Sequence, residues 1–155
     1  MAAGPVDQTP VSASLVEAER FLTGLDDDWA RHIAAIGPCR YQPKPTREPY
    51  EALVRAIAYQ QLSVRAGDTM VARLLARWPD SAFPAPEQLL ASTTEELRAC
   101  GFSGSKVAAM QGIAAATLDG LVPSLAEAAT LADDALIARL TTLRGVGRWT
   151  VEMFL

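Results

Sequence analysis

The chain has 155 residues, of which half are apolar and 21% are charged. This composition is that of a folded globular protein and excludes a chain that stays disordered for want of apolar surface. The formal net charge of −4 excludes a protein that holds nucleic acid by an overall positive field. Any nucleic-acid binding must therefore depend on a local surface.

The two cysteines, Cys39 and Cys100, lie far apart and form no CxxC pair. They exclude a disulfide framework and a cysteine-based metal knuckle, and we expect both to be buried, reduced thiols. The first residues have neither the basic nor the apolar region of a signal peptide. No apolar run approaches the roughly 20 residues that span a bilayer. The sequence therefore predicts a soluble, cytoplasmic protein with no membrane contact.

Proline, glycine and capping residues mark the starts and ends of predicted helices along the whole chain. We expect residues 1–14 to be a flexible N-terminus and residues 15–155 to form one helical domain. The first helix is predicted to follow a capping box made by Ser14 and Glu17. Three aspartates at 26–28 suit the positive end of a second helix, which should stop at Gly37-Pro38.

Four prolines make residues 38–49 an extended connection, and the last of them, Pro49, suits a first helical position. The helix that it opens has an apolar stripe at helical spacing. Ser63 is expected to cap the next helix, which Pro79 ends, and Pro86 opens a short one. The apolar residues of the two longer helices are Tyr50, Leu53, Val54 and Ile57, then Val71, Leu74, Leu75 and Trp78.

Similar signals continue to the end of the chain. Thr93 and Glu96 form a second capping box, and the helix that they start should end at Gly101. A long helix is predicted from Ser103 to Gly120, with Val107, Met110, Ala114 and Leu118 inside. The pair Asp133-Asp134 should cap a helix to about Thr142, and the last helix should begin at Arg148.

These elements predict an all-α fold of many short helices, because no segment has a convincing strand pattern and no repeat is present. The last predicted helix has completed barely two turns at Leu155. A domain boundary seldom falls inside an apolar helix, whose buried face would lack partners. We therefore expect the domain to be incomplete at its C-terminus.

The sharpest motif is LRGVGRWT at residues 143–150, between two predicted helices. Its glycines admit backbone conformations closed to other residues and leave the amides of the next helix accessible. Such a turn can bind one phosphate through backbone donors and the helix dipole, with Arg144 and Arg148 adding local charge. The alternative is an ordinary tight hairpin between helices with a glycine cap.

Three segments together resemble the helix-hairpin-helix DNA glycosylase superfamily, in particular the bacterial 3-methyladenine DNA glycosylase II group. They are PYEALVRAIAYQQLS at 49–63, LRACGFSGSKVAAMQGIA at 97–114 and LRGVGRWTVEMFL at 143–155. The resemblance covers about residues 15–155 and implies a compact, all-α glycosylase domain without an N-terminal β-domain. It also implies a bacterial cytoplasmic protein that associates with the nucleoid.

The resemblance implies a DNA-binding hairpin. Backbone amides of Gly145, Gly147 and Thr150 would bind a DNA phosphate, with Arg148 beside them. Backbone carbonyls at the end of the preceding helix would hold a monovalent cation, Na⁺ or K⁺, that bridges to the phosphate; these are the carbonyls of Thr141, Leu143 and Val146. The negative end of a helix dipole makes a cation there physically sensible.

The resemblance also implies a pocket for an extruded base. Gln60 and Gln61 would face the lesion, and Gln61 would fill the gap left by the flipped nucleotide, although a solvated helix end explains both residues equally simply. Trp149 would stack on a cationic alkylated purine, with Met153 in the same pocket. The alternative for Trp149 is a core anchor for the last helix.

Trp149 occupies the position where bifunctional relatives carry a nucleophilic lysine. A tryptophan has no amine to attack the sugar, so the resemblance implies a monofunctional glycosylase that uses base flipping and an activated water. The catalytic aspartate of the family would lie about twenty residues after Trp149, beyond Leu155. No acid in the chain, Glu152 included, stands in that position. We expect these 155 residues alone to be inactive or nearly so.

The expected partner is double-stranded DNA with alkylated bases, and no obligatory protein partner is predicted. The resemblance leaves 3-methyladenine, 7-methylguanine, ethenoadenine and hypoxanthine open as substrates. No cofactor is expected to be required, and the cysteines lack the grouping of an iron–sulfur cluster. Two other functions stay open: a non-catalytic helix-hairpin-helix DNA-binding module, and a helical protein-interaction domain in which every motif is a packing feature.

Overall fold

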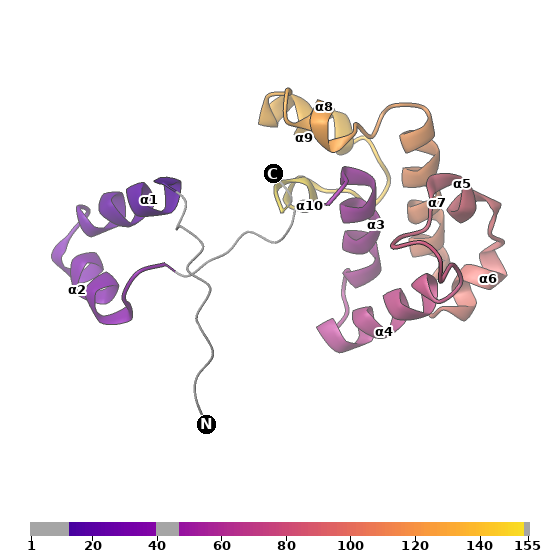
Figure 1. Ribbon diagram of the computed structural model, residues 1–155, viewed down its shortest axis with the longest axis horizontal. Coiled ribbons are helices and arrows are strands. Elements are labelled where there is room, and N and C mark those ends of the chain that lie inside the picture. The colour runs from indigo at the N-terminus through magenta and orange to yellow at the C-terminus, as the bar shows by residue number, and fades with distance from the viewer. Residues whose placement is uncertain (1–12, 40–46, 154–155) are drawn as a thin grey trace. The chain divides into compact units, whose positions relative to one another are not determined.

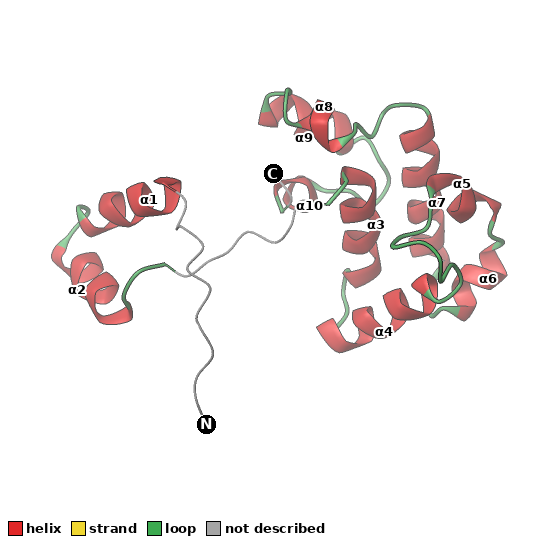
Figure 2. Cartoon of the chain, viewed as in Figure 1, coloured by secondary structure: helices red, strands yellow, loops and turns green. Residues whose placement is uncertain are grey.

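The computed structural model describes residues 13–39 and 47–153, which form ten helices and no strand (Figures 1 and 2). This confirms the all-α prediction. The chain divides into two compact units, Met1–Pro45 and Thr46–Leu155, and each is described by itself. Within the described ranges, no helix is long and apolar enough to cross a membrane. Most of the flexible N-terminus predicted at residues 1–14 lies outside the described residues, and one domain over 15–155 stays a prediction.

The first unit is a pair of helices, α1 (Ala13–Thr23) and α2 (Asp27–Ile36). The Asp26 carboxylate accepts a hydrogen bond from the Trp29 amide at 2.8 Å, as an N-cap does. The predicted capping box at Ser14 is not at the helix start, because α1 already includes Ala13. Cys39 is half-buried, not fully buried as expected, and its amide donates to the Glu19 carboxylate.

The second unit contains eight helices, most of which begin where the sequence predicts. Pro49 opens α3, and Thr93 and Glu96 bond reciprocally before α6. Ser63 and Ser103 accept from the third amide of α4 and α7. The helices are α3 (Pro49–Tyr59), α4 (Val64–Leu75), α5 (Pro86–Ala91), α6 (Thr94–Ala99), α7 (Gly104–Leu118), α8 (Leu125–Ala128), α9 (Asp133–Leu140) and α10 (Arg148–Glu152).

Four details of this unit differ from the predictions. Helix α8, capped by Ser124, was not predicted. Helix α9 has Ala132 at its N-cap, so the aspartates lie in its first turn and stabilise it through the helix dipole instead. Trp78 lies in a turn, because α4 ends at Leu75. Leu118 is 50% exposed, since it is the last residue of α7.

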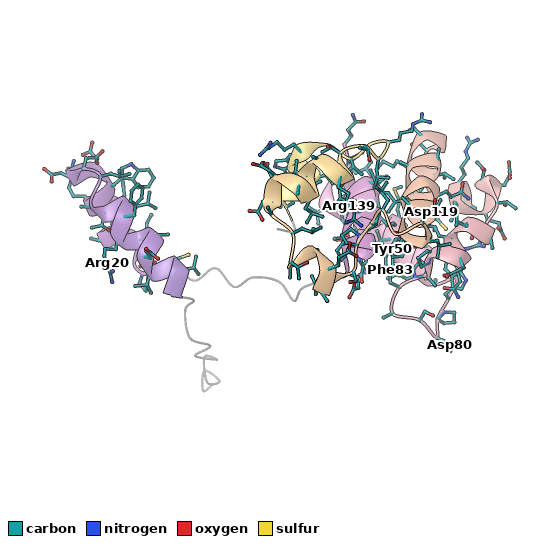
Figure 3. All side chains as sticks on the ribbon, turned by 90° about the horizontal axis from the view of Figure 1, so that it is seen from above. Arg20, Tyr50, Asp80, Phe83, Asp119 and Arg139 are labelled. Carbon is teal, nitrogen blue, oxygen red and sulfur yellow. The ribbon has the colours of Figure 1, made fainter. Side chains whose placement is uncertain are left out.

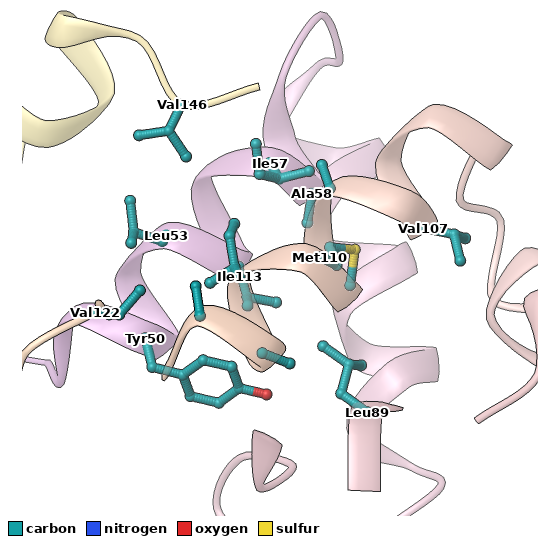
Figure 4. Packing of buried hydrophobic residues seen from close by; sticks show 14 of the residues in the cluster. Tyr50, Leu53, Ile57, Ala58, Leu89, Val107, Met110, Ile113, Val122 and Val146 are labelled. Atoms are coloured by element: carbon teal, nitrogen blue, oxygen red, sulfur yellow. The ribbon is translucent and has the colours of Figure 1, made fainter. Parts of the chain in front are cut away.

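The core of the second unit forms around α3 and α7, which pack against each other (Figure 1). Val146, from the turn before α10, belongs to the same apolar cluster (Figure 4). The position of α10 therefore depends on the core. The largest fully buried side chains come from every helix of the unit except α8: Leu53, Val54, Ile57, Leu74, Leu89, Leu97, Val107, Met110, Ile113, Leu136, Leu140 and Val151.

Two further contacts hold parts of this unit together, and their residues Tyr50, Phe83 and Arg139 are labelled in Figure 3. Tyr50 and Phe83 meet edge to face, with ring centroids 5.8 Å apart. Burial raises the pKa of the Tyr50 hydroxyl, and the negative charge of Glu87 raises it further. Arg139 of α9 donates to the carbonyls of Gly120 and Leu121 at 2.5 and 2.7 Å. It thereby ties α9 to the end of α7.

We predict that Met110→Ala lowers the free energy of unfolding by about 2–5 kcal/mol, because it leaves a cavity at a site with no exposed surface. Leu118→Ala in the same helix is the matched control and should change it by less than about 0.5 kcal/mol. Urea denaturation followed by circular dichroism measures both. Equal losses would show that α7 does not bury the face assigned to it.

Candidate functional site

The turn between α9 and α10 is held in place by its packing against the core. Gly145 has φ +82°, a left-handed conformation that favours glycine. A β carbon at Gly145 would lie 3.2 Å from Cδ1 of Ile57 and 3.5 Å from Cβ of Ala109. Val146, which follows, is buried, and its amide donates to the Leu143 carbonyl at 3.1 Å. The sequence LRGVG therefore produces a turn whose backbone is seated on α3 and α7.

Several backbone amides of this turn lack an acceptor among the described residues. They are those of Gly145 and, at the start of α10, Gly147, Arg148 and Trp149. The Thr150 amide, also expected to bind phosphate, donates to the Gly147 carbonyl at 2.9 Å. A β carbon at Gly147 would meet nothing within 4 Å, so the space in front of these amides is open. Such a group of amides is suited to an anion.

The carbonyls expected to hold a cation lie in the same turn. Thr141 caps α9, and the Leu143 carbonyl accepts from the Val146 amide. The carbonyls of Thr141 and Val146 accept no hydrogen bond among the described residues. All three groups are neutral carbonyl oxygens, which are the ligands that Na⁺ and K⁺ take from backbone turns. The residues present therefore fit a monovalent cation.

The two arginines that flank the turn differ in their surroundings. Arg148 donates to Glu152 at 2.7 Å and lies 3.4 Å from an oxygen of Asp134. The carboxylate of Glu152, and to a lesser degree that of Asp134, raises the pKa of the Arg148 guanidinium. Arg144 is exposed and makes no ion pair among the described residues. Arg144 therefore contributes the more available positive charge.

A hollow of about 460 Å³ lies beside the turn, between the end of α3 and α10. It brings together all the residues that the sequence assigned to a base pocket, including Gln61. Its lining also contains three residues that the sequence analysis did not assign to it. The full lining is Ala56, Tyr59, Gln60, Gln61, Trp149, Thr150 and Met153.

The two glutamines at the end of α3 have different surroundings. Gln60 donates from Nε2 to the Gly145 carbonyl at 2.8 Å, across 85 residues of sequence. Gln61 is exposed and has φ +58°, an uncommon conformation for a residue with a side chain. Strained backbone of this kind clusters at binding sites. Gln60 therefore connects the hollow to the turn, and Gln61 stands free at its edge.

Lys106 of α7 holds the end of α3 in place, which the sequence analysis missed. Its Nζ donates to the carbonyls of Ala58 and Gln60 at 2.7 and 2.9 Å. These carbonyls end a helix and would otherwise lack donors. Burial lowers the pKa of the Lys106 ammonium. The local signal for this role was a single lysine at the start of a mostly apolar helix.

Trp149 of α10 and Met153, the residue that follows this helix, lie four positions apart and are 70% and 64% exposed. Trp149 is therefore not buried among the described residues, as a core anchor would be. The buried residues of α10 are Thr150 and Val151 instead. An exposed indole and thioether at the mouth of a hollow offer apolar surface to a flat ligand.

The model of the family described as "HhH-GPD superfamily base excision DNA repair protein" matches residues 54–151. Curated proteins similar to the chain include "DNA-3-methyladenine glycosylase 1" of Schizosaccharomyces pombe, 41% identical over 96% of the chain and 66% of that protein. An "alkylbase DNA glycosidase-like protein" of the same yeast is 34% identical over 88% of the chain and 65% of its own length. The chain thus spans about two thirds of the length of these relatives.

Solved structures give the same likeness. A 3-methyladenine DNA glycosylase of S. pombe in complex with abasic DNA superimposes with a TM-score of 0.80 at 42% identity, over 90% of this chain and 68% of that one. A DNA-3-methyladenine glycosidase of Bacillus halodurans gives a TM-score of 0.74 at 27% identity, over 92% and 63%.

The two glycines of the turn should differ in their effect on stability. Gly145→Ala should lower the free energy of unfolding by about 1–3 kcal/mol, because alanine strains at φ +82° and meets Ile57. Gly147→Ala should change it by less than about 0.5 kcal/mol, since its φ is −97° and its surroundings are open. Urea titrations of both variants measure this, and the reverse order would refute the described turn.

Proposed function

The chain belongs to the HhH-GPD superfamily of base excision DNA repair proteins, and on this premise we propose that it serves the hydrolytic removal of alkylated purines from double-stranded DNA. The observation that carries the proposal is the hollow that Gln60, Gln61, Trp149 and Met153 line directly beside a turn of unpaired amides. A phosphate on the turn and a flipped base in the hollow could be held at the same time.

The turn supports DNA binding by an acidic protein. The open amides at Gly147 and the start of α10 would donate hydrogen bonds to a phosphate, with Arg144 and Arg148 near it. The carbonyls of Thr141, Leu143 and Val146 would hold Na⁺ or K⁺, which when bound supplies positive charge next to that phosphate. No other cofactor is part of the proposal, and an iron–sulfur cluster is not expected.

The hollow supports a role for each of its named residues. Gln61, exposed and strained at the rim, would enter the space left by the extruded nucleotide. Trp149 offers an exposed aromatic face to a cationic base, and Met153 extends the apolar surface. Gln60 would keep the rim of the hollow and the turn at a fixed distance from each other, through its hydrogen bond to the Gly145 carbonyl.

Trp149 also determines the proposed chemistry. A tryptophan cannot form a Schiff base with the sugar, so base removal would use water and leave the strand intact. The activating aspartate is proposed to follow Trp149 by about twenty residues, and such a residue is not among the 155. The proposed activity is that of a 3-methyladenine DNA glycosylase of type II. These 155 residues alone are proposed to bind damaged DNA and to release little or no base.

Base release tests the chemistry. The 155 residues should release almost no purine from methylated duplex DNA, because the proposed activating aspartate lies outside them. A chimera in which they continue into the C-terminal third of the 41% identical S. pombe relative should release free base without cutting the strand. Chromatography of released bases and denaturing gels measure the two events. Strand scission by the chimera would contradict the assignment of Trp149.

Phosphate binding at the turn should depend on Gly147. Gly147→Ala places a β carbon in front of the open amides and should weaken duplex binding about tenfold, by loss of a charged hydrogen bond. Gly104→Ala at the start of α7 is the matched control, because its β carbon also meets nothing within 4 Å. Fluorescence anisotropy at one fixed salt concentration measures both.

Three outcomes of this binding experiment distinguish the candidate functions. Loss with Gly147→Ala alone supports the turn as the phosphate site. Binding that depends on Gly147 but shows no preference for damaged DNA favours a non-catalytic helix-hairpin-helix module. No DNA binding by the unaltered chain would favour a protein-interaction domain.

A further inference from the structure

Gln61 stands at the rim of the hollow in a backbone conformation that few residues with a side chain adopt. Its φ is +58°, and among the described residues it is the only residue other than glycine with a positive φ. A β carbon makes this left-handed conformation unfavourable, so contacts with neighbouring residues must hold it. Gln61 is exposed there and lines the hollow. The contacts at the end of α3 therefore determine where its side chain stands.

Helix α4 fixes one side of this end of α3. A β carbon on Gly67 would overlap Cδ1 and Cε1 of the Tyr59 ring, so the ring packs directly against the Gly67 backbone. The Tyr59 hydroxyl donates to Oδ1 of Asp68 at 2.5 Å. The Leu62 amide donates to the Tyr59 carbonyl at 3.1 Å. Two successive residues of α4 thus hold the last residue of α3, and the chain beyond it folds back onto its carbonyl.

Lys106 of α7 fixes the other side. Its Nζ donates to the carbonyls of Ala58 and Gln60, which flank Tyr59 in sequence, at 2.7 and 2.9 Å. Neither carbonyl accepts a backbone amide within the described part of the chain, because α3 has ended and no further turn supplies one. The ammonium also lies at the negative end of the α3 dipole, where a cation is stabilised. Lys106 is therefore the donor on which both carbonyls depend.

The Gln60 carbonyl is the direct link between Lys106 and Gln61. A peptide unit is planar, so the direction of the Gln60 carbonyl and the φ of Gln61 change together when the unit rotates. Lys106 binds this carbonyl, and the Gln60 side chain donates to the Gly145 carbonyl at 2.8 Å, so Gln60 is held through its backbone and its side chain. Without Lys106, the carbonyl would be free to turn toward water, and Gln61 would be free to return to an ordinary negative φ.

The position of Lys106 is itself determined by the start of α7. Lys106 is the third residue of that helix, and its amide donates to the hydroxyl oxygen of the N-cap Ser103 at 3.3 Å. Its side chain forms no ion pair among the described residues, so no carboxylate there competes with the two carbonyls. The fixed start of one helix therefore sets the geometry at the end of another.

We propose that Lys106 is a positioning residue for nucleotide extrusion: by binding the carbonyls on either side of Tyr59, it holds Gln61 in the conformation that enters the space left by the flipped nucleotide. Lys106 does not line the hollow, so it acts through Gln61 and not on the damaged base. The inference rests on the proposed function, because it requires that Gln61 fill this space.

The test follows unstacking in a duplex that carries 2-aminopurine beside one central nucleotide, either 7-methylguanine or guanine, on a 2′-fluoro sugar that resists hydrolysis. The fluorescence of 2-aminopurine rises when its neighbour leaves the stack. The variants are Lys106→Met, Lys106→Arg, Gln61→Ala and the double variant of Lys106→Met with Gln61→Ala. Fluorescence anisotropy with the guanine duplex, at one salt concentration, gives the Kd that reports binding by the turn.

Gln111→Met is the matched control for loss of a donor on α7. Gln111 donates from Nε2 to the Ser92 carbonyl at 2.9 Å and so ties the end of α5 to α7, as Lys106 ties the end of α3. It does not line the hollow. A purely structural effect of losing such a contact would appear in the melting temperatures of both variants, whereas the fluorescence rise should change only with Lys106→Met.

Lys106→Met should lower the fluorescence rise for 7-methylguanine about fivefold or more, because φ +58° at Gln61 is no longer held. Gln61→Ala should lower it as much, and the double variant should lower it no further, since both changes act on one side chain. Lys106→Arg should retain most of the rise, because a guanidinium still donates to both carbonyls. The Kd for the guanine duplex should change about twofold or less in all these variants, because none removes an amide of the turn.

Other outcomes overturn the inference while the proposed function stands. If Lys106→Met weakens binding of the guanine duplex as much as it lowers the rise, Lys106 supports only the turn. If Gln111→Met lowers the rise equally, the effect is one of general stability. If the effects of Lys106→Met and Gln61→Ala add in full, Lys106 does not act through Gln61.

Two further results complete the test. If the unaltered chain gives no larger rise with 7-methylguanine than with guanine, the proposed function and the inference fall together. If Lys106→Met does not fold, Lys106→Gln decides, since its side chain lacks the charge and is one atom shorter. An unchanged rise in that variant refutes the inference.

Discussion

The hydrogen bond from Gln60 to the Gly145 carbonyl is the contact on which the arrangement of the site depends. At 2.8 Å it joins the end of α3 to the turn before α10, across 85 residues of sequence. The same carbonyl belongs to the glycine whose left-handed backbone packs against Ile57 and Ala109. Lys106 completes the connection, because it holds the Gln60 carbonyl from α7. The turn before α10 and the end of α3 that lines the hollow are therefore parts of one packed unit.

This construction explains how an acidic chain can be suited to a polyanion. The net charge of −4 opposes long-range attraction of a polyanion. The backbone N–H groups of the turn are already oriented, so no rearrangement is needed when an anion binds. Arg148, the obvious cation at the site, already pairs with Glu152. In the proposed site, the backbone amides and Arg144, and not Arg148, would therefore carry most of the attraction for an anion. Association by this surface should be specific in geometry and modest in rate.

The sequence predicted what local chemistry determines. Ser63, Thr93 and Ser103 start helices where expected, because each accepts from an amide three residues ahead. Pro49 does so because its fixed φ suits a first helical position. The pocket residues Gln60, Trp149 and Met153 were predicted by resemblance to a family, and the hollow contains them. By contrast, α8 was not predicted, although Ser124, which accepts from the Glu127 amide, is a local signal for its start.

What the sequence did not predict depends on distant contacts. Lys106 lies 46 residues from the carbonyl of Gln60 that it binds, and no periodicity links the two. Leu118 has an apolar side chain at the correct helical spacing, yet it is half exposed because α7 ends there. From the sequence, Tyr59 is one more apolar residue of α3, and its contacts with α4 are visible only in the structure. Its partners Gly67 and Asp68 are recognisable only in three dimensions.

The packing of Tyr59 on Gly67 restricts the order in which these positions can change during evolution. A β carbon at position 67 would overlap the ring, so an aromatic residue at 59 is accessible only to a chain that already has glycine there. Once the ring is present, position 67 can no longer accept alanine without moving it. Glycine at position 67 is therefore a condition for the tyrosine ring at 59, and the two positions are not free to change independently.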